Sequence, residues 1–352
     1  MTGADHDDVR RAHGYHTLTV KGIVPETEDT RSFVLDVPAA LGDTFSYRPG
    51  QFCTFRVHID GEEHLRSYSM SSAPETDSDL TVTVKRVPGG LVSNWLLDHV
   101  AVGDQLETTR PAGVFCLRDT RTPVVAFCGG SGVTPVLSLA KSALASTDRS
   151  VKLIYANRNQ DSVIFAGTLD AMRRAYPDRL LVHHHLDTDA GFLVADAVAE
   201  FAGGPGSDFY ICGPGPFMDL VESTLLQIGV DPDHIFIERF LVGEQPAPLV
   251  DAESDPTTVV PETVTVIMKG KKTAVAYQRG DTLLETARRG GLRPPFSCEA
   301  GDCATCMAIL REGTATMRAN NALTAEEVAE GWVLTCQALP AGPTVTVEYE
   351  TM

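Results

Sequence analysis

Long apolar runs are missing from this sequence, and so is a surplus of positive charge. No stretch approaches the length of a membrane span, and the first residues, MTGADHDDVRRAHG, lack the apolar segment of a signal peptide. The formal net charge is −18, whereas non-specific nucleic-acid binding needs a basic surface. We therefore expect a soluble cytoplasmic protein with no membrane span and no nucleic-acid partner.

Cysteine is scarce, and its distribution is uneven. The 352 residues include only eight cysteines, yet three of them, Cys298, Cys303 and Cys306, fall within the stretch FSCEAGDCATC. Cys336 follows 30 positions later. In the cytoplasm, clustered cysteines more often bind metal or carry out redox chemistry than form disulfides. The spacing C-x4-C-x2-C with a distant fourth cysteine is typical of a plant-type [2Fe–2S] cluster.

Zinc and free thiols are the alternatives for this loop. Structural zinc sites usually place one close cysteine pair opposite a second close pair, whereas Cys336 stands alone. An iron–sulfur loop also needs small residues, because backbone N–H groups must turn inward to bond the sulfurs. The loop contains such residues at Ser297, Ala300, Gly301, Ala304 and Thr305. The iron–sulfur interpretation is favoured, with zinc or free thiols left open.

Changes in pattern predict three domains. Residues 14–118 contain six short β-rich runs between turn residues, which predicts a small antiparallel β-barrel. In residues 119–240 strand-like and helical stretches alternate, which predicts a parallel sheet with helices on both faces. Residues 263–352 indicate a small α+β domain with a hairpin, a capped helix, the cysteine loop and a final strand.

Two segments lie outside these domains. Residues 1–13 are expected to form an N-terminal tail. Residues 241–262 contain five acids, four prolines and neither Lys nor Arg, which predicts a solvated, semi-extended linker.

The segment RSYS lies on a predicted strand of the barrel. Arg66 offers a cation for phosphate, Tyr68 an aromatic face for stacking, and Ser67 and Ser69 two hydroxyl groups. In isolation, four such residues are usually strand surface.

A glycine pair follows about twenty residues later, in GGLVSNW. Gly89 and Gly90 precede Ser93 at an expected helix start, where free N–H groups bind phosphate well. Together the two segments resemble the R-x-Y-S and G-G-x-x-S motifs of the ferredoxin–NADP reductase superfamily. The resemblance implies FAD, with Arg66 and Ser93 at the pyrophosphate. It also implies Tyr68 against the isoalloxazine, and the final serine of RSYS near the flavin N5.

Two glycine-rich turns follow predicted strands of the second domain. In CGGSGVTP, Gly130 and Gly132 supply the first two glycines of G-x-G-x-x-G, but Pro135 replaces the third, so the dinucleotide fingerprint is incomplete. The segment CGPGPFM stands at the carboxyl end of a later strand. Open parallel sheets bind ligands along that edge, although a tight strand–helix connection explains a lone glycine turn equally well.

The same superfamily has matching motifs in both turns, which implies a nicotinamide site. Thr134 and Cys212 would lie near the nicotinamide. Glu238 would lie near the flavin ring, and a surface acid is the alternative interpretation. The other residues expected to line the dinucleotide or the flavin are Gly129, Gly130, Gly132, Gly213, Pro214, Gly215 and Phe240.

The choice between NADH and NADPH depends on the segment YANRNQ, which follows the strand where the adenosine ribose is bound. Arg158 in this segment could meet a 2′-phosphate. Relatives with a similar YANR stretch use NADH, however. We expect NADH, with NADPH left open.

Residues 263–352 resemble a plant-type ferredoxin, which implies a β-grasp fold with Cys298, Cys303, Cys306 and Cys336 as cluster ligands. Glu299 departs from the pattern, because many relatives have Arg there. An acid beside the cluster would disfavour the more negative reduced state.

The order of the three motif sets resembles that of oxygenase reductases, which pass electrons from NADH through FAD and a [2Fe–2S] cluster to a partner oxygenase. SNWLLDH, YANRNQDSVIF, ICGPGPFM and FSC most resemble the reductases of Rieske-type 3-ketosteroid 9α-hydroxylases, which implies steroid catabolism. The reductases of phenylacetyl-CoA epoxidases share CQALP and are the near alternative. A general diaphorase and a non-enzymatic iron–sulfur redox sensor are two further alternatives.

Three consecutive histidines, His183 to His185, suggest a metal site at first sight. They lie on a predicted strand, where neighbouring side chains point to opposite faces and cannot converge on one ion. Cys53 and Cys116 are expected to be small buried residues of the barrel.

Overall fold

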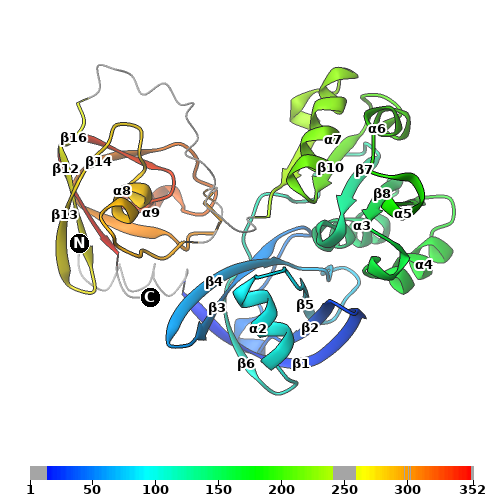
Figure 1. The fold of residues 1–352 in the computed structure, drawn as a ribbon, viewed down its shortest axis with the longest axis horizontal. Coiled ribbons are helices and arrows are strands. Elements are labelled where there is room, and N and C mark those ends of the chain that lie inside the picture. Colours follow the sequence, from blue (N-terminus) through cyan, green and yellow to red (C-terminus); the bar gives the residue numbers. More distant parts are fainter. Residues whose placement is uncertain (1–13, 241–258, 297, 300, 302, 350–352) are drawn as a thin grey trace.

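The computed structural model describes residues 14–240, 259–296, 298, 299, 301 and 303–349. Figure 1 shows three separate sheets, coloured blue to cyan, green, and yellow to red along the chain. The predicted tail, 1–13, and residues 241–258 of the predicted linker lie outside the described residues. The domain boundaries stay predictions. In the part of the chain that is described, no helix has both the length and the apolar character needed to cross a bilayer.

The first sheet is a six-stranded antiparallel barrel with the order β4-β3-β6-β1-β2-β5. Its strands have alternating apolar residues, such as Phe33 and Leu35 of β2, that fill the interior. A bridge between Met70, just after β4, and Val82 of β5 brings the two outer strands together. The elements are β1 (Tyr15–Thr27), β2 (Thr30–Asp36), η1 (Ala39–Leu41), β3 (Phe52–Ile59), β4 (Glu62–Ser69), β5 (Leu80–Lys85), α2 (Leu91–His99) and β6 (Gln105–Thr109). The predicted six-stranded barrel is confirmed.

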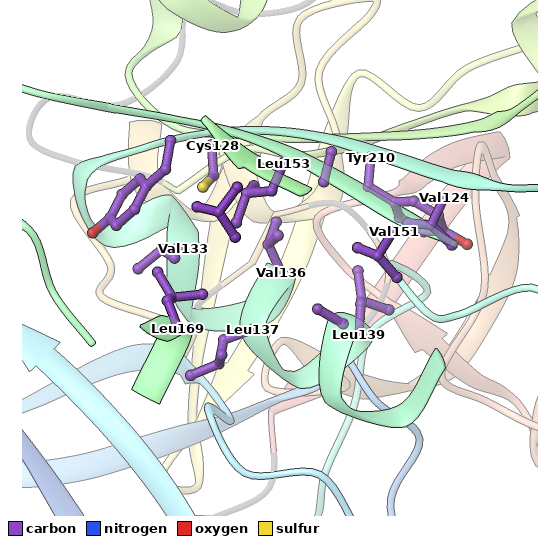
Figure 2. Packing of buried hydrophobic residues seen from close by; sticks show 14 of the residues in the cluster. Val124, Cys128, Val133, Val136, Leu137, Leu139, Val151, Leu153, Leu169 and Tyr210 are labelled. Atoms are coloured by element: carbon purple, nitrogen blue, oxygen red, sulfur yellow. The ribbon is translucent and has the colours of Figure 1, made fainter. Parts of the chain in front are cut away.

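The second sheet is parallel, with the order β11-β10-β7-β8-β9. Its central strand β7 is buried along its whole length because helices cover both faces. Helices α3 and α4 pack on one face, and α6 and α7 on the other. Figure 2 shows the first of these cores, with Val136 of α3 beneath Cys128 and Leu153 of the strands. The predicted parallel sheet with helices on both faces is confirmed.

The strands of this domain are β7 (Val124–Gly129), β8 (Val151–Asn157), β9 (Leu180–Leu186), β10 (Asp208–Cys212) and β11 (Ile235–Glu238). Its helices are η2 (Gly130–Gly132), α3 (Val133–Ser146), η3 (Gln160–Ser162), α4 (Ala166–Ala175), α5 (Asp187–Ala190), α6 (Ala195–Ala202), α7 (Gly215–Gln227) and η4 (Pro232–His234). The three histidines lie on β9. His184 approaches Tyr155 on one face, whereas His183 approaches Phe201 of α6 on the other, so they do not converge.

The third sheet is mixed, with the order β13-β12-β16-β14-β15 and a parallel pair β12–β16 at its centre. Leu283 and Ala287 of α8 pack on it, and the predicted capping box between Thr282 and Glu285 is present. The sequence predicted the hairpin, the helix and the final strand but missed β14, which has a largely exposed middle, and β15. The elements are β12 (Thr263–Met268), β13 (Lys271–Ala276), α8 (Leu283–Arg289), β14 (Met307–Met317), α9 (Ala325–Ala329), β15 (Trp332–Leu334) and β16 (Ala338–Tyr349).

The barrel contacts both other domains. Ser138 of α3 donates to the backbone oxygen of Ser72 at 2.6 Å, and Lys141 of the same helix pairs with Asp77 at 3.0 Å. On the other side, Arg293 forms an ion pair with Glu62 at the start of β4 at 3.2 Å. The barrel therefore stands between the nucleotide domain and the cysteine-rich domain.

Candidate functional site

The four cysteines of the predicted cluster site come together as two adjacent pairs. The backbone N–H of Cys298 lies 3.5 Å from the sulfur of Cys303. A hydrogen bond with the Cys298 thiol, and then burial, raises the pKa of Cys303. Cys336 has the same effect on the pKa of Cys306. Each predicted ligand thus has one nearest predicted ligand, and the charge of Cys303 also raises the pKa of Cys306, so the two pairs are neighbours.

The loop backbone is shaped for inward-facing donors. Glu299, Gly301 and Ala304 have positive φ angles of 49°, 88° and 54°. At Gly301 an added Cβ would also lie 3.0 Å from the carbonyl oxygen of Ala319, which only glycine avoids. The buried hydroxyl of Thr305 has no well-aligned hydrogen bond within the described residues, although it lies close enough to Cys303 to lower its pKa. Such a hydroxyl can donate to a cluster sulfur.

The paired arrangement bears on the choice between a cluster and zinc. Within the described residues, no three His, Cys, Asp or Glu side chains surround a single point, as one zinc ion would require. Two pairs of thiols fit a [2Fe–2S] cluster, in which each iron takes two protein ligands. The residues present therefore fit the cluster better than zinc.

The RSYS segment forms the last half of β4, with its side chains alternating between two faces. Ser67 bonds to the hydroxyl of Thr54 at 2.9 Å, and the ring of Tyr68 meets Phe55 edge to face at 5.9 Å between centroids. Arg66 is exposed and donates to the backbone oxygen of Leu65 at 2.7 Å. Burial raises the pKa of Tyr68, so its phenol stays neutral.

Ser69 carries the feature of β4 that most directly indicates a ligand. Its side chain is 3% exposed, and its hydroxyl has no hydrogen-bond partner among the described residues. Leaving a buried polar group unsatisfied costs about 1–3 kcal/mol. A flavin ring nitrogen at the end of β4 would satisfy this hydroxyl, which is the role predicted for Ser69.

The predicted phosphate site is the first turn of α2. Gly89 has a φ angle of +71°, and Gly90 is the N-cap residue, with no described side chain capping the helix. A Cβ on Gly90 would lie 2.8 Å from the hydroxyl of Ser93. This hydroxyl accepts a hydrogen bond from the backbone N–H of Val87 at 3.2 Å. The first-turn N–H groups of α2 therefore remain available to an anion.

The two glycine turns lie directly against each other where β7 and β10 end side by side. A Cβ on Gly132 would lie 2.1 Å from the backbone oxygen of Cys212, and one on Gly129 would lie 2.8 Å from Pro214. A Cβ on Gly213 would in turn lie 3.0 Å from the backbone nitrogen of Gly129. Helices α3 and α7 leave these turns toward opposite faces of the sheet. This is the switch point at which open parallel sheets bind ligands.

The residues predicted near the nicotinamide lie in and under this edge. Thr134 is buried and donates to the backbone oxygen of Ser131 at 2.9 Å. Cys212 is fully buried between Cys128 and Glu238 of the neighbouring strands, and burial, then Glu238, raises the pKa of its thiol. Glu238, the last residue of β11, and Phe240, two residues beyond the strand, are half-buried. Gly130 and Gly215 line the same edge.

A charged group that sequence reasoning missed faces these turns. Lys85, at the end of β5, has its ammonium 4.0 Å from the point where a Cβ on Gly130 would lie. Asp29 pairs with Lys85 at 3.8 Å and with Arg158 at 3.5 Å. Burial lowers the pKa of Lys85. The feature of the sequence that could have indicated Lys85 is the Lys-Arg pair at the end of the predicted strand before Gly89.

A cavity of about 550 Å³ separates the barrel from the cysteine loop. The loop contributes Cys303 and Ala304 to its wall, and the barrel contributes Arg48, Arg110 and His16 among others. The predicted cluster site therefore faces the barrel across a polar cavity whose wall also includes Asp43.

Three family models match consecutive parts of the chain. The oxidoreductase FAD-binding domain matches residues 17–116, the oxidoreductase NAD-binding domain residues 127–223, and the 2Fe-2S iron-sulfur cluster binding domain residues 266–341.

Two relatives and one solved structure match nearly the whole chain. The ferredoxin reductase component of 3-ketosteroid-9-alpha-monooxygenase from Mycolicibacterium smegmatis is 40% identical, with 95% of this chain and 96% of that protein aligned. One component of the 1,2-phenylacetyl-CoA epoxidase of Escherichia coli is 31% identical, over 96% of this chain and 98% of that protein. The structure of phthalate dioxygenase reductase shares the fold, with a TM-score of 0.59, 23% identity, and coverage of 99% of this chain and all of that one.

Proposed function

Because the chain belongs to the family of ferredoxin reductases that serve oxygenases, we propose that it supplies electrons to a 3-ketosteroid 9α-hydroxylase of the Rieske type. Family membership makes the chain an NAD(P)H-dependent oxidoreductase that uses FAD and a [2Fe–2S] cluster. The single observation that carries the choice of partner is the 40% identity over 95% of the chain to reductases named for that oxygenase.

When bound, FAD would supply the conversion of an electron pair from a nicotinamide into single electrons, and the cluster would supply a one-electron carrier. The protein's part is to place these groups. The glycine turns at the ends of β7 and β10 hold the dinucleotide, and α2 with Arg66 holds the FAD pyrophosphate. Ser69 orients the flavin ring through its otherwise unpaired hydroxyl. The cysteine loop faces the barrel across a shared cavity, so the cluster would lie on the side of the barrel that Cys303 lines.

The partner is tested by reconstitution. Anaerobic protein is titrated with NADH while the flavin and iron–sulfur absorption bands are followed, and it is then combined with either a 3-ketosteroid hydroxylase or a phenylacetyl-CoA epoxidase. We expect both bands to bleach and turnover to be faster with the steroid oxygenase. Faster turnover with the epoxidase would assign the alternative partner. If the protein reduces soluble electron acceptors and neither oxygenase gives turnover above that activity, the protein would be a diaphorase.

We also propose that NADH is the electron donor and that the protein acts in the cytoplasm. None of the eight cysteines, all within the described residues, forms a disulfide, as in a reducing compartment. Arg158 is the cation that could meet a 2′-phosphate, and the carboxylate of Asp29, which also pairs with Lys85, lies 3.5 Å from it. Since the carboxylate also opposes a nearby phosphate, the pair favours NADH.

Replacing Asp29 with asparagine is expected to raise the NADPH/NADH ratio of kcat/KM. The change frees Arg158, whose side chain is 73% exposed, and removes a negative charge. An exposed ion pair contributes at most about 1 kcal/mol, so the rise is at most about fivefold. Glu28→Gln, which removes the neighbouring exposed acid, is the matched control and should leave the ratio unchanged. An equal ratio for both variants would show that Asp29 does not influence the choice of nicotinamide.

A further inference from the structure

Glu299 occupies an unusual place in the cysteine loop. It directly follows the predicted ligand Cys298, and its φ angle of +49° lies in the left-handed region. A residue with a Cβ adopts this conformation only when its surroundings hold it there, because the conformation costs free energy. From the sequence alone, Glu299 is an isolated acid beside the cluster.

Arg288, in the last turn of α8, holds this carboxylate with two parallel hydrogen bonds. Its Nη1 lies 3.0 Å from Oε2 of Glu299, and its Nη2 lies 2.9 Å from Oε1. The side chains are only 15% and 17% exposed, so the pair is largely shielded from water. Such a bidentate ion pair fixes the orientation of the carboxylate and also neutralises its charge. The guanidinium carbon of Arg288 also lies 3.8 Å from the ring centroid of Phe296, which precedes Cys298 by two residues.

Gln337, which follows the fourth predicted ligand Cys336, also contacts Glu299. Its Nε2 donates to the backbone oxygen of Glu299 at 2.7 Å and lies 3.6 Å from the sulfur of Cys336. Glu299 is thus bonded on one side to α8 and on the other to the residue that follows the fourth predicted ligand.

We propose that Arg288 and Glu299 act as positioning residues: they hold the cluster loop on α8 and neutralise the carboxylate beside the cluster. Reduction adds a negative charge to the cluster, and an unpaired carboxylate next to it would oppose that step. The ion pair removes this opposition while its two hydrogen bonds hold the loop conformation. The inference rests on the cluster ligands proposed above.

The test compares Arg288→Gln, Glu299→Gln and the double variant with the wild-type chain. Arg289→Gln is the matched control, because it removes the adjacent cation of the same helix, which pairs with Asp281 instead. Two properties are measured: the rate of cluster loss in the presence of an iron chelator, and the cluster's midpoint potential in a dye-coupled titration.

We expect both single variants to lose the cluster about tenfold faster than the wild type, in the range found for residues that orient metal ligands. The midpoint potential falls in Arg288→Gln, which leaves a lone carboxylate, and rises in Glu299→Gln, which leaves a lone guanidinium. The double variant loses the cluster quickly but keeps nearly the wild-type potential. Arg289→Gln matches the wild type in both properties.

Shifts of the potential in one direction for both single variants would overturn the electrostatic part of the proposal. Unchanged cluster loss would overturn the positioning part. If Arg288→Gln fails to fold, the sign of the shift in the conservative Glu299→Gln decides alone. A wild-type chain without a cluster would overturn the ligand assignment together with this proposal. A loaded wild type whose single variants behave like Arg289→Gln would overturn this proposal only.

Discussion

Replacing Cys336 with serine removes the iron–sulfur bands and lowers NADH-dependent reduction of cytochrome c on the order of 100-fold, whereas reduction of ferricyanide by NADH is retained. Cys336 is buried beside Cys306, and the four cysteines outside the predicted ligand set lie in the first two domains. Mutating a residue that only orients a metal ligand already lowers metal affinity about 10–100-fold. We therefore expect that removing a ligand itself has an effect of at least about 100-fold. Ferricyanide takes electrons directly from the flavin, so its reduction is independent of the cluster.

The matched control is Cys116→Ser. Cys116 is a buried cysteine of the barrel region, and its thiol lies 3.5 Å from the backbone oxygen of Gly113, where a serine hydroxyl can also donate. This variant should keep the cluster and both activities. The visible spectrum and the two acceptor assays check the result. Undiminished cytochrome c reduction by Cys336→Ser would mean that electrons do not pass through the cysteine loop.

The cysteine spacing correctly predicted an iron–sulfur domain, which the family model places at residues 266–341, because its information is local. Three of the four cysteines lie within nine residues, and the small residues between them impose the tight backbone that a cluster needs. The strands of the barrel were predictable for a similar reason, since the alternation of apolar residues directly sets which face is buried. The middle of β14 is polar and exposed, so alternation provided no signal there and the strand was missed.

Contacts and burial that depend on packing between distant segments of the chain could not be predicted from the sequence. The sequence shows Glu299 as an unpaired acid, because its partner Arg288 lies on a helix whose position against the loop is set by the third sheet. It likewise contains no sign that Asp29, between two barrel strands, meets Arg158 of the nucleotide domain. The burial of Thr134 and Cys212 also follows from the close approach of the two glycine turns, which no single motif reveals.

A buried ion pair stabilises the nucleotide domain at the end of the sheet opposite the glycine turns. Asp208, at the start of β10, and Arg149 have side chains that are 1% and 3% exposed, and their charged atoms lie 2.7 Å apart. Thr120 and Thr122 donate to the same carboxylate at 2.5 and 2.7 Å, and Nδ1 of His234 lies 2.8 Å from its other oxygen. These groups join the start of β10 to the segments before β7, β8 and β11.

Replacing Asp208 with asparagine should destabilise this domain by about 3–5 kcal/mol, the usual effect of leaving a buried charge without its partner. Amide hydrogen exchange in β7 and β10 and urea unfolding measure the change. Asp196→Asn on the exposed face of α6 is the control and should leave both unchanged. Faster exchange confined to β11 would limit the role of Asp208 to holding His234.

The contribution of Asp208 also has a defined pH dependence. Burial alone would raise the pKa of this carboxyl, but hydrogen bonds from Thr120, His234 and Thr122 and the charge of Arg149 hold it below the ordinary value of 3.8. Because the folded state binds the proton less tightly than the unfolded state, the stabilisation is complete above that ordinary value. It is lost as the pH falls through the lower folded pKa. The stability difference between wild type and Asp208→Asn should therefore be constant from neutral pH to about pH 5 and shrink in more acidic solution. A difference that persisted undiminished in acid, where the unfolded carboxyl is protonated, would mean that the folded carboxyl does not have the lowered pKa given by its partners.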